Sequence, residues 1–281
     1  MRFVRYTTAG TPEWGVLVDG EVHALGARPS GPPSLAEVGD ETVRNDIRRD
    51  VEDGVLPTRD ASAVSLLAPV PSPGKIVCAG LNYHDHAEEQ DEEPPEKPML
   101  FTKSPTAVAN PGDAVVHPDG VEQVDYEVEL AAVVGRTATD VPRADAEDYV
   151  AGYTVLNDVS ARDAQFDDGQ FFRGKSYDTF APMGPTLVAG DGFDPNAADV
   201  ELRVNGTVKQ ASNTEEFIFD VADLVSYVSG FTTLRPGDVI STGTPGGVGI
   251  FRDPPELLEP GDTVQAEIET IGVLENDVVA E

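Results

Sequence analysis

Three acidic residues in the middle of the chain have the types and spacing of a metal site. The alternation of apolar and acidic residues over 124–130 predicts a strand, and alternate side chains of a strand point to the same face. Glu127 and Glu129 would then lie on one face, together with Asp125, and repel each other. A divalent cation between them would remove that repulsion, and Asp158, after the next apolar run, can supply a third oxygen. Carboxylate ligands suit Mg²⁺, Mn²⁺ or Ca²⁺ better than zinc.

The same acids have a second interpretation, as part of a solvated surface. The chain has 51 Asp and Glu residues against 19 Lys and Arg, which gives a formal net charge of −32. In so acidic a chain, alternating acids on a strand are commonly the water-facing side of a sheet. The spacing alone leaves both interpretations open.

A histidine and a glutamate form a candidate general base. On the helix predicted for residues 82–91, His86 and Glu89 are three residues apart and therefore neighbours. A carboxylate beside an imidazole orients the ring and raises its basicity, as a general base requires. The alternative is an exposed helix on which the two residues meet by chance. Lys175, one of five lysines, would hold an anionic substrate or a developing oxyanion if it faces the carboxylates, or would simply pair with a nearby acid.

Arg162, Gln165 and Thr244 complete the candidate site. A helix beginning directly after Asp158 would place Arg162 and Gln165 on one face, directed back towards the carboxylates. Thr244 lies in the glycine-rich segment 243–249, whose backbone amides can hold a substrate carboxylate. That segment lacks the Lys-Ser/Thr ending of a phosphate-binding loop and leads into no obvious helix, so it is weak evidence for nucleotide binding.

The predicted elements place these residues in the second of two units. Residues 1–68 predict a small α/β unit with three short strands, a tight turn at Asp19-Gly20 and two helices, the first capped by Ser34. A proline-rich linker follows at 69–74, and the candidate catalytic unit covers 75–281. Its predicted strands are 75–79, 123–134, 185–188, 199–204, 238–242 and 263–268, and its predicted helices are 82–91, 143–150, 159–166 and 221–229. The fold class is α+β, mostly β.

Composition excludes several classes of protein. No run of about 18 apolar residues exists, so no membrane span is predicted, and the N-terminus lacks an apolar signal core. The single cysteine, Cys78, lies in an apolar run and is predicted to be a small buried hydrophobe. The charge argues against nucleic acid and anionic membranes as partners. Dense carboxylate with little lysine is typical of a halophile, whose cytoplasm holds molar salt, so a cytoplasmic location is expected.

Six segments, taken together, resemble the fumarylacetoacetate hydrolase family. They are Lys75–Tyr83 followed by His86 and Glu89, Asp125–Leu130, Asn157–Asp163, Gly174–Pro185, Val204–Gly206 and Pro236–Gly249. Each segment alone is weak evidence, but six in the family's order are specific. The resemblance therefore favours the metal site over the solvated surface.

The resemblance implies a mixed β-sandwich roll, a homodimer and a divalent metal, usually Mg²⁺, on the three acids. It also implies that the His–Glu pair lies on a lid over the substrate. Lys175 and Gln165 match positions that line the family's pocket, and Thr244 matches the position that contacts a substrate carboxylate. One departure is Leu81, where acylpyruvase-type members carry Arg. It weakens the case for acylpyruvate or oxaloacetate, and brings the chain closer to members acting on diketo or 2-keto-3-deoxy sugar acids and on aromatic ring-fission products.

The expected function is hydrolysis of a C–C bond in a 2,4-diketo acid, either acylpyruvate-like or a diketo-deoxy sugar acid, through a metal-held enolate. The pair of His86 and Glu89 favours water activation and so hydrolysis. The alternatives are isomerisation or decarboxylation of a 2-hydroxyhepta-2,4-diene-1,7-dioate, and dehydration of a 2-keto-3-deoxy sugar acid. A carboxylate-binding protein without activity is a remote alternative, because it would need no such pair.

Overall fold

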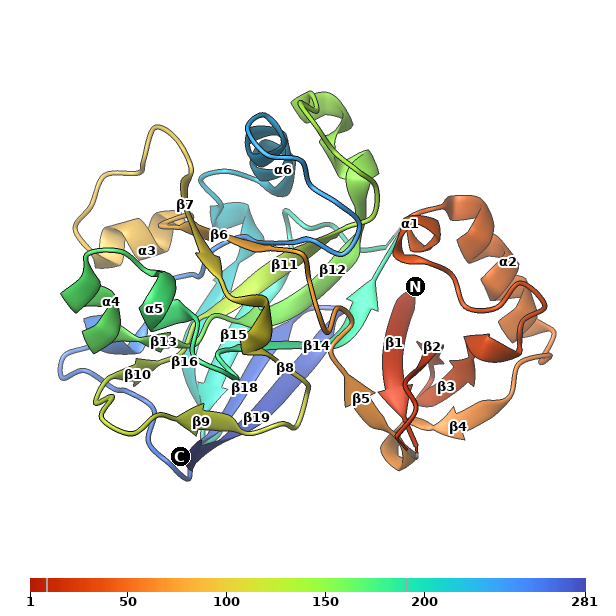
Figure 1. Ribbon diagram of the computed structural model, residues 1–281, viewed down its shortest axis with the longest axis horizontal. Helices are drawn as coiled ribbons and strands as arrows, with labels where there is room; N and C mark the ends of the chain where they lie inside the picture. Colours follow the sequence, from red (N-terminus) through yellow and green to blue (C-terminus); the bar gives the residue numbers. More distant parts are fainter. Residues whose placement is uncertain (9, 191) are drawn as a thin grey trace.

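A large mixed β-sheet runs through the molecule (Figure 1). The structure, a computed structural model, describes residues 1–8, 10–190 and 192–281. Within these residues the sheet has twelve strands, and its main path is β4 (Thr58–Asp60), β3 (Glu21–Ala24), β2 (Glu13–Val18), β1 (Arg2–Thr7), β14 (Ala181–Val188), β12 (Val150–Asn157), β11 (Val128–Val134), β17 (Val239–Ser241), β6 (Ile76–Gly80) and β7 (Met99–Lys103). Off this path, β5 (Ser65–Leu67) pairs with β1 and β8 (Val108–Ala109) pairs with β14.

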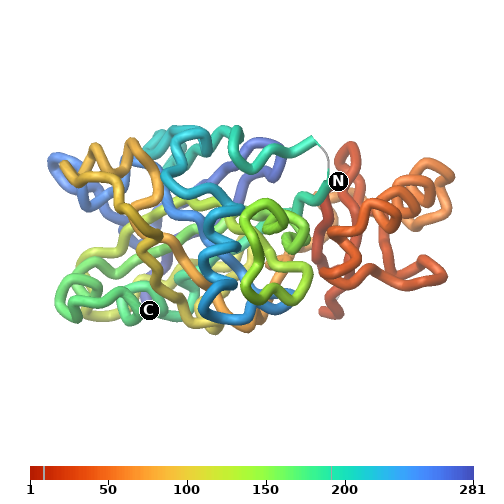
Figure 2. Tube along the Cα trace, turned by 90° about the horizontal axis from the view of Figure 1, so that it is seen from above, coloured from red at the N-terminus to blue at the C-terminus, as the bar shows by residue number. Residues whose placement is uncertain are grey.

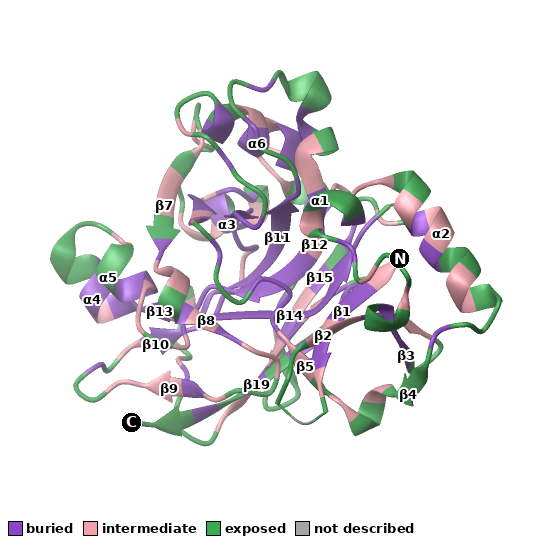
Figure 3. Cartoon of the chain, turned by 45° about the vertical axis from the view of Figure 1, so that its right-hand side comes forward, coloured by how far each residue is buried: buried purple, intermediate pink, exposed green. Residues whose placement is uncertain are grey.

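Helices lie mainly around the outside of the sheets. The central strands β11 and β14 of the large sheet are buried, whereas its terminal strand β4 is exposed (Figure 3). The α-helices are α1 (Leu35–Val38), α2 (Glu41–Glu52), α3 (His84–Glu89), α4 (Arg162–Asp168), α5 (Phe172–Lys175) and α6 (Val221–Ser229). The 3₁₀ helices are η1 (Leu25–Ala27), η2 (Ala61–Ala63), η3 (Pro105–Ala107), η4 (Arg143–Tyr149), η5 (Thr214–Glu216) and η6 (Gly249–Phe251). The segment predicted as a helix at 143–150 is therefore a 3₁₀ helix, and it ends at Tyr149 because Val150 begins β12.

Residues 1–8 and 10–68 lie at one end of the molecule (Figures 1 and 2). The predicted turn between β2 and β3 is present: Asp19 and Gly20 both have positive φ, 48° and 82°, as tight hairpin turns require. Ser34 and Glu37 form a capping box at the start of α1. The N-terminal strands are hydrogen-bonded into the large sheet, because β1 pairs with β14.

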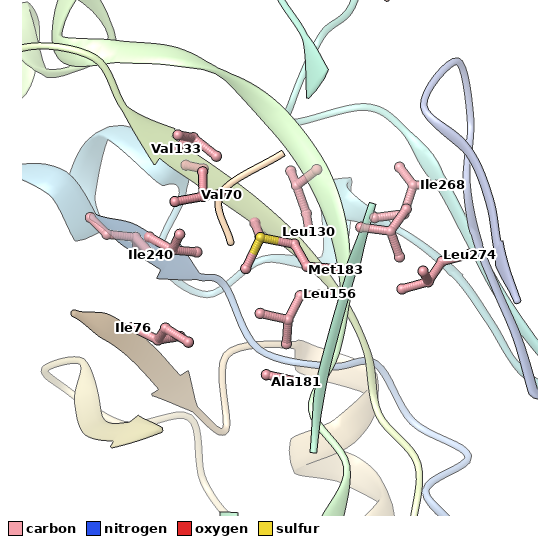
Figure 4. Packing of buried hydrophobic residues seen from close by; sticks show 14 of the residues in the cluster. Val70, Ile76, Leu130, Val133, Leu156, Ala181, Met183, Ile240, Ile268 and Leu274 are labelled. Atoms are coloured by element: carbon pink, nitrogen blue, oxygen red, sulfur yellow. The ribbon is translucent and has the colours of Figure 1, made fainter. Parts of the chain in front are cut away.

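A second sheet of five strands lies against the large one. Its order is β16 (Thr207–Asn213), β15 (Asp199–Val204), β18 (Thr263–Ile268), β19 (Gly272–Ala280) and β9 (Val115–His117). Side chains of both sheets share one core, in which Leu130, Leu156 and Met183 of the large sheet pack in the same cluster as Ile268 and Leu274 of the second sheet (Figure 4). Burial of these apolar surfaces is the main force that holds the sheets together. The expected fold, α+β and mostly β, is confirmed.

The strand predicted at 123–134 is two strands in the structure. They are β10 (Val124–Asp125), which pairs with β13 (Ser160–Ala161) in a small separate sheet, and β11. At the break, the amide of Glu127 donates to Asn157 Oδ1 at 3.1 Å. The amide of Val128 donates to Gln210 Oε1 at 3.0 Å. Side chains thus replace strand neighbours at the point where the chain leaves one sheet for the other.

The helix after Asp158 begins later than predicted. It begins at Arg162 rather than at Val159, because Ser160 and Ala161 are already paired in β13. Asp158 therefore lies on an extended segment between β12 and β13. From there its backbone amide donates to the carbonyl of Glu127 at 2.8 Å.

Candidate active site

The three predicted metal ligands come together in the structure. Glu127 directly precedes β11, Glu129 lies within it, and Asp158 follows β12, its antiparallel neighbour. One carboxylate oxygen of each residue lies within 4.8 Å of those of the other two, and all three residues are buried. The acids are therefore not part of a solvated face. A cluster of carboxylate oxygens at this separation suits a divalent cation such as Mg²⁺ or Mn²⁺.

Electrostatics gives a physical reason for a cation at this cluster. Burial, together with Asp158 and Glu127, raises the pKa of Glu129 well above its ordinary value of 4.5. Burial also acts to raise the pKa of Glu127, but Lys175 and Arg162 outweigh it and lower that pKa to about 2. The surroundings thus destabilise the ionised form of Glu129, and a bound divalent cation would stabilise that form.

Two buried lysines balance part of the negative charge. Lys175, which the sequence singled out, donates from Nζ to Glu127 Oε2 at 2.7 Å and to Asp158 Oδ2 at 2.8 Å. Lys103, which the sequence did not single out, donates to the other carboxylate oxygen of Asp158 and to the carbonyl of Val159 at 3.0 Å. The available signal was scarcity: both are among five lysines in a chain rich in acids.

Arg162 joins the carboxylates to the start of α4. Its Nε donates to Asp125 Oδ2 at 2.9 Å, its Nη1 to Gln165 Oε1 at 2.9 Å, and its Nη2 to Glu127. Burial would lower the pKa of Arg162, but Glu127 and Asp125 together raise it. Its charge is therefore compensated within the protein, while Arg162 and Gln165 both line the cavity described below.

Asp125 has a different role from the two glutamates that follow it. Its carboxylate accepts hydrogen bonds from the amides of Gly249 at 2.9 Å and Ile250 at 3.0 Å, as well as from Arg162. Because the strand breaks after Asp125, this acid holds the end of the glycine-rich segment. It does not belong to the acidic cluster of Glu127, Glu129 and Asp158.

His86 and Glu89 lie within hydrogen-bond distance on α3. His86 Nδ1 and Glu89 Oε2 are 3.1 Å apart, and Glu89 Oε1 accepts from the amide of Gly247 at 2.8 Å. When Nδ1–H donates to the carboxylate of Glu89, Nε2 of His86 is an acceptor. It lies 2.9 Å from the side-chain nitrogen Nε2 of Gln90. The dyad is thus oriented for proton transfer at Nε2. Gln90 is a contact that the sequence did not indicate.

The glycine-rich segment orients protein groups. Gly243 N donates to Glu129 Oε2 at 3.1 Å, and Ser241 Oγ donates to the same oxygen. Thr244 Oγ1 donates to Val128 O at 2.9 Å and accepts from Gln210 Nε2 at 2.8 Å. Thr244 also lines the cavity, which is compatible with its predicted contact with a substrate carboxylate. That contact stays a prediction.

Gly247 holds the other end of that segment against the second sheet. Its φ is +99°, and a Cβ added there would lie 2.2 Å from the carbonyl oxygen of Lys209. Only glycine fits this approach. The amide that holds Glu89 is therefore fixed by a backbone position that other residues cannot take.

Candidate catalytic side chains line a cavity of about 350 Å³. Its polar lining includes Glu127, Glu129, Lys175, Arg162, Gln165, His86, Gln90 and Thr244. Its remaining lining is largely apolar. His86 of the dyad and two of the three acids, Glu127 and Glu129, thus face the same space. This combination of a concave site, convergent polar groups and perturbed carboxyl groups is typical of an active site.

Two predictions from composition also have structural counterparts. Cys78 is fully buried, and burial raises the pKa of its thiol well above the ordinary value, which fits its predicted role as a small core residue. Among the helices of the described residues, none has the length and apolar character needed to cross a membrane.

The chain is similar to proteins with several related activities. Oxaloacetate tautomerase Fahd2a, mitochondrial, of Rattus norvegicus is 47% identical over 226 residues, which cover 80% of this chain and 72% of that protein. The structure of fumarylacetoacetate hydrolase from psychrophilic Exiguobacterium antarcticum has a TM-score of 0.88 and 41% identity, with 100% of both chains covered. Maleylpyruvate hydrolase from Sphingobium sp. SYK-6, in complex with manganese(II) ion and pyruvate, has a TM-score of 0.82 and 31% identity, covering 100% of this chain and 99% of that chain.

Two family models match adjacent parts of the chain. Residues 1–69 match the family described as Rv2993c-like, N-terminal. Residues 75–279 match the family described as Fumarylacetoacetate (FAA) hydrolase C-terminal. This range contains the acidic cluster of Glu127, Glu129 and Asp158, the dyad and the residues that line the cavity. This chain therefore belongs to the fumarylacetoacetate hydrolase family of enzymes.

Proposed function

We propose that this enzyme hydrolyses a C–C bond of a 2,4-diketo acid. The observation that carries the proposal is that His86, oriented by Glu89, lines the same cavity as Glu127 and Glu129 of the acidic cluster. Glu127, Glu129 and Asp158 would hold the divalent cation. That cation, when bound, supplies the positive charge that stabilises a 2-oxo carboxylate and the enolate derived from it.

His86 would act on water. Its Nε2 takes a proton as the water oxygen bonds to the C4 carbonyl carbon, and Glu89 stabilises the imidazolium that forms. The C3–C4 bond then breaks, its electron pair passes into the enolate, and the proton held by His86 goes to C3. The products are a carboxylic acid and a 2-oxo acid. Gln90 now donates to Nε2, so it occupies the position from which water would approach.

Lys175 would support the negative charge that develops. Its ammonium lies between Glu127 and Asp158, and 5.1 Å from the centre of the Phe101 ring. Burial would lower the pKa of Lys175, but Asp158 and Glu127 raise it above the ordinary value. The group therefore stays charged beside the proposed enolate.

Keto–enol tautomerisation is the second candidate function. It is supported by the rat relative, which carries the name oxaloacetate tautomerase and is 47% identical. The same His86 would remove a proton from C3 and return it to the enol oxygen, with no bond between carbons broken. A homodimer and preference for Mg²⁺ remain parts of the proposal, to be checked by light scattering and by metal titration.

A panel of substrates separates the two candidates. The purified enzyme, in KCl with Mg²⁺ or Mn²⁺, would be given 2,4-diketo acids and enol-oxaloacetate. Release of one pyruvate for each acylpyruvate consumed, measured with coupled lactate dehydrogenase, supports hydrolysis. Rapid ketonisation of enol-oxaloacetate, without release of pyruvate from any diketo acid, would replace hydrolysis with tautomerisation.

A further inference from the structure

One wall of the cavity is made by the ends of β6 and β7. Leu81 directly follows β6, and Met99 and Phe101 belong to β7. Met99 pairs with Gly80 across the two strands, and a Cβ added to Gly80 would lie 2.5 Å from Met99 Cε. The absence of a side chain at Gly80 therefore leaves the space that Met99 occupies. This wall offers an apolar surface to the cavity.

The other walls carry aromatic rings. Phe171 packs edge-on against Phe101, with ring centres 5.4 Å apart, and Phe251 packs edge-on against His86 at 5.9 Å. Phe166 of α4 also lines the cavity and is 57% exposed, compared with 40% for Phe251 and 43% for Met99. Three large apolar side chains that line one cavity thus keep much of their surface in water. An apolar group bound between them would cover that surface, which is favourable.

The charges of the lining do not favour a second carboxylate. Among the described residues that line the cavity, one is a lysine, Lys175, and one is an arginine, Arg162. Each already forms ion pairs with two carboxylates. Glu92, the charged group that the exposed loop after α3 adds to the lining, is negative. A carboxylate at the remote end of a substrate would meet apolar rings and Glu92 instead of an uncompensated cation.

We infer that the substrate carries an apolar or aromatic group at the end remote from its 2-oxo acid. The reacting end rests on the proposed function. The remote end rests on the lining side chains Leu81, Met99, Phe166 and Phe171. Phe101 and Phe251 continue this apolar lining up to Lys175 and His86. Monocarboxylic diketo acids with an alkyl or aryl tail, which are acylpyruvates, are then the favoured class, ahead of dicarboxylic acids of equal length. The expectation drawn from Leu81 in the sequence, against acylpyruvates, is thereby reversed.

Binding of unreactive 2-oxo acids tests the remote end separately from the reaction. Isothermal titration of the Mn²⁺-loaded protein would compare pyruvate, 2-oxobutanoate, 2-oxohexanoate, phenylpyruvate and 2-oxoglutarate. Affinity should rise about fourfold for each methylene that becomes buried. 2-Oxohexanoate and phenylpyruvate should both bind more tightly than 2-oxoglutarate. Tighter or equal binding of 2-oxoglutarate, or no binding of any of these acids, would overturn the inference.

A variant pair locates the preference in the wall. Leu81→Arg adds a cation, so it should strengthen binding of 2-oxoglutarate and weaken that of 2-oxohexanoate. Leu81→Gln, which adds polarity without charge, should weaken 2-oxohexanoate alone. If graded binding is found but no diketo acid is cleaved, the proposed hydrolysis fails and the apolar tail stands. If diketo acids are cleaved without graded binding, only the apolar tail fails.

Discussion

Lys103 and Asp158 form an ion pair in which neither side chain has exposed surface. Lys103 reaches Asp158 from β7, and Lys175 holds the opposite carboxylate oxygen. Burial lowers the pKa of Lys103, whereas Asp158 acts to raise it. Loss of Asp158 would leave the buried charge of Lys103 without a carboxylate, and loss of Lys103 would leave Asp158 with Lys175 as its lysine partner.

Replacement of Lys103 by methionine tests the contribution of this ion pair. We expect Lys103→Met to lower the free energy of unfolding of the metal-free protein by about 3–5 kcal/mol, because Asp158 loses a buried counter-ion. Mn²⁺ should restore more stability to the variant than it adds to the wild type, since the cation would replace the missing charge. Urea unfolding in EDTA and in Mn²⁺ measures both effects. Lys97→Met, at an exposed lysine, is the matched control, and a similar small loss in both variants would contradict the expectation.

The raised pKa of Glu129 predicts that metal affinity depends on pH. Below that pKa the metal-free carboxyl group carries a proton, which a cation must displace. Affinity for Mn²⁺ should therefore increase with pH, by up to about tenfold per unit. Titration calorimetry in two buffers with different ionisation enthalpies should also detect a released proton. Affinity that is constant with pH, with no proton released, would be inconsistent with this account.

The raised pKa of Glu129 has the opposite effect on the stability of the metal-free protein: stability should fall as pH rises, whereas metal affinity increases. Because the folded pKa of Glu129 lies above the ordinary value of 4.5, its ionisation opposes the folded state. The metal-free protein should lose stability as pH rises from 4.5 through the folded pKa, and Glu129→Gln should lose part of that dependence. Glu129→Gln should also bind Mn²⁺ at least tenfold more weakly, a change of about 1.4 kcal/mol. Thermal unfolding in EDTA across this range, with exposed Glu122→Gln as the control, provides the measurement.

The dyad predicts non-additive kinetics. His86→Ala and Glu89→Gln should each lower kcat for hydrolysis, His86→Ala by about 10²–10⁴-fold, and the double variant should be little worse than His86→Ala. Affinity for Mn²⁺ should stay near the wild-type value, since neither residue belongs to the acidic cluster. Decarboxylation of oxaloacetate, which needs no activated water, should survive in His86→Ala. Near wild-type hydrolysis by His86→Ala would exclude it as the base.

The net charge of −32 predicts that salt stabilises this protein. At about 1 M salt the screening length falls to about 3 Å, so repulsion among surface carboxylates is weakened. The melting temperature should rise from dilute buffer into molar KCl, and more than in sucrose of equal osmolality. A melting temperature that is highest in dilute buffer would also remove the argument for a halophilic source.

The sequence predicts the acidic site better than it predicts its supports. Strand alternation correctly brings Glu127 and Glu129 together, and the spacing of His86 and Glu89 predicts their contact on a helix. Neither pattern predicts that the strand is interrupted before β11. The interruption depends on the side chains of Asn157 and Gln210, which are distant in sequence. For the same reason α4 begins three residues later than predicted: pairing of β10 with β13 overrides local helical preference.

Lys103 shows what local patterns omit. It is the last residue of β7, 55 positions before Asp158, and no motif links the two. Only the pairing of β6 with β7 and of β6 with β17 brings β7 towards the carboxylates. The contact that holds α3 is likewise tertiary, since Glu89 accepts from the amide of Gly247, and the lid over the substrate stays a prediction. The boundary near residues 69–74 stays a prediction.

The pairing of β1 with β14 has a consequence for any shortened form of the enzyme. Arg2 and Phe3 pair with Val188 and Leu187, at the end of a strand whose residues are all buried. Removal of residues 1–68 would turn this stretch into an open apolar edge, and such edges attract strands of other molecules. We therefore expect a form of the enzyme without residues 1–68 to self-associate more readily than the whole chain.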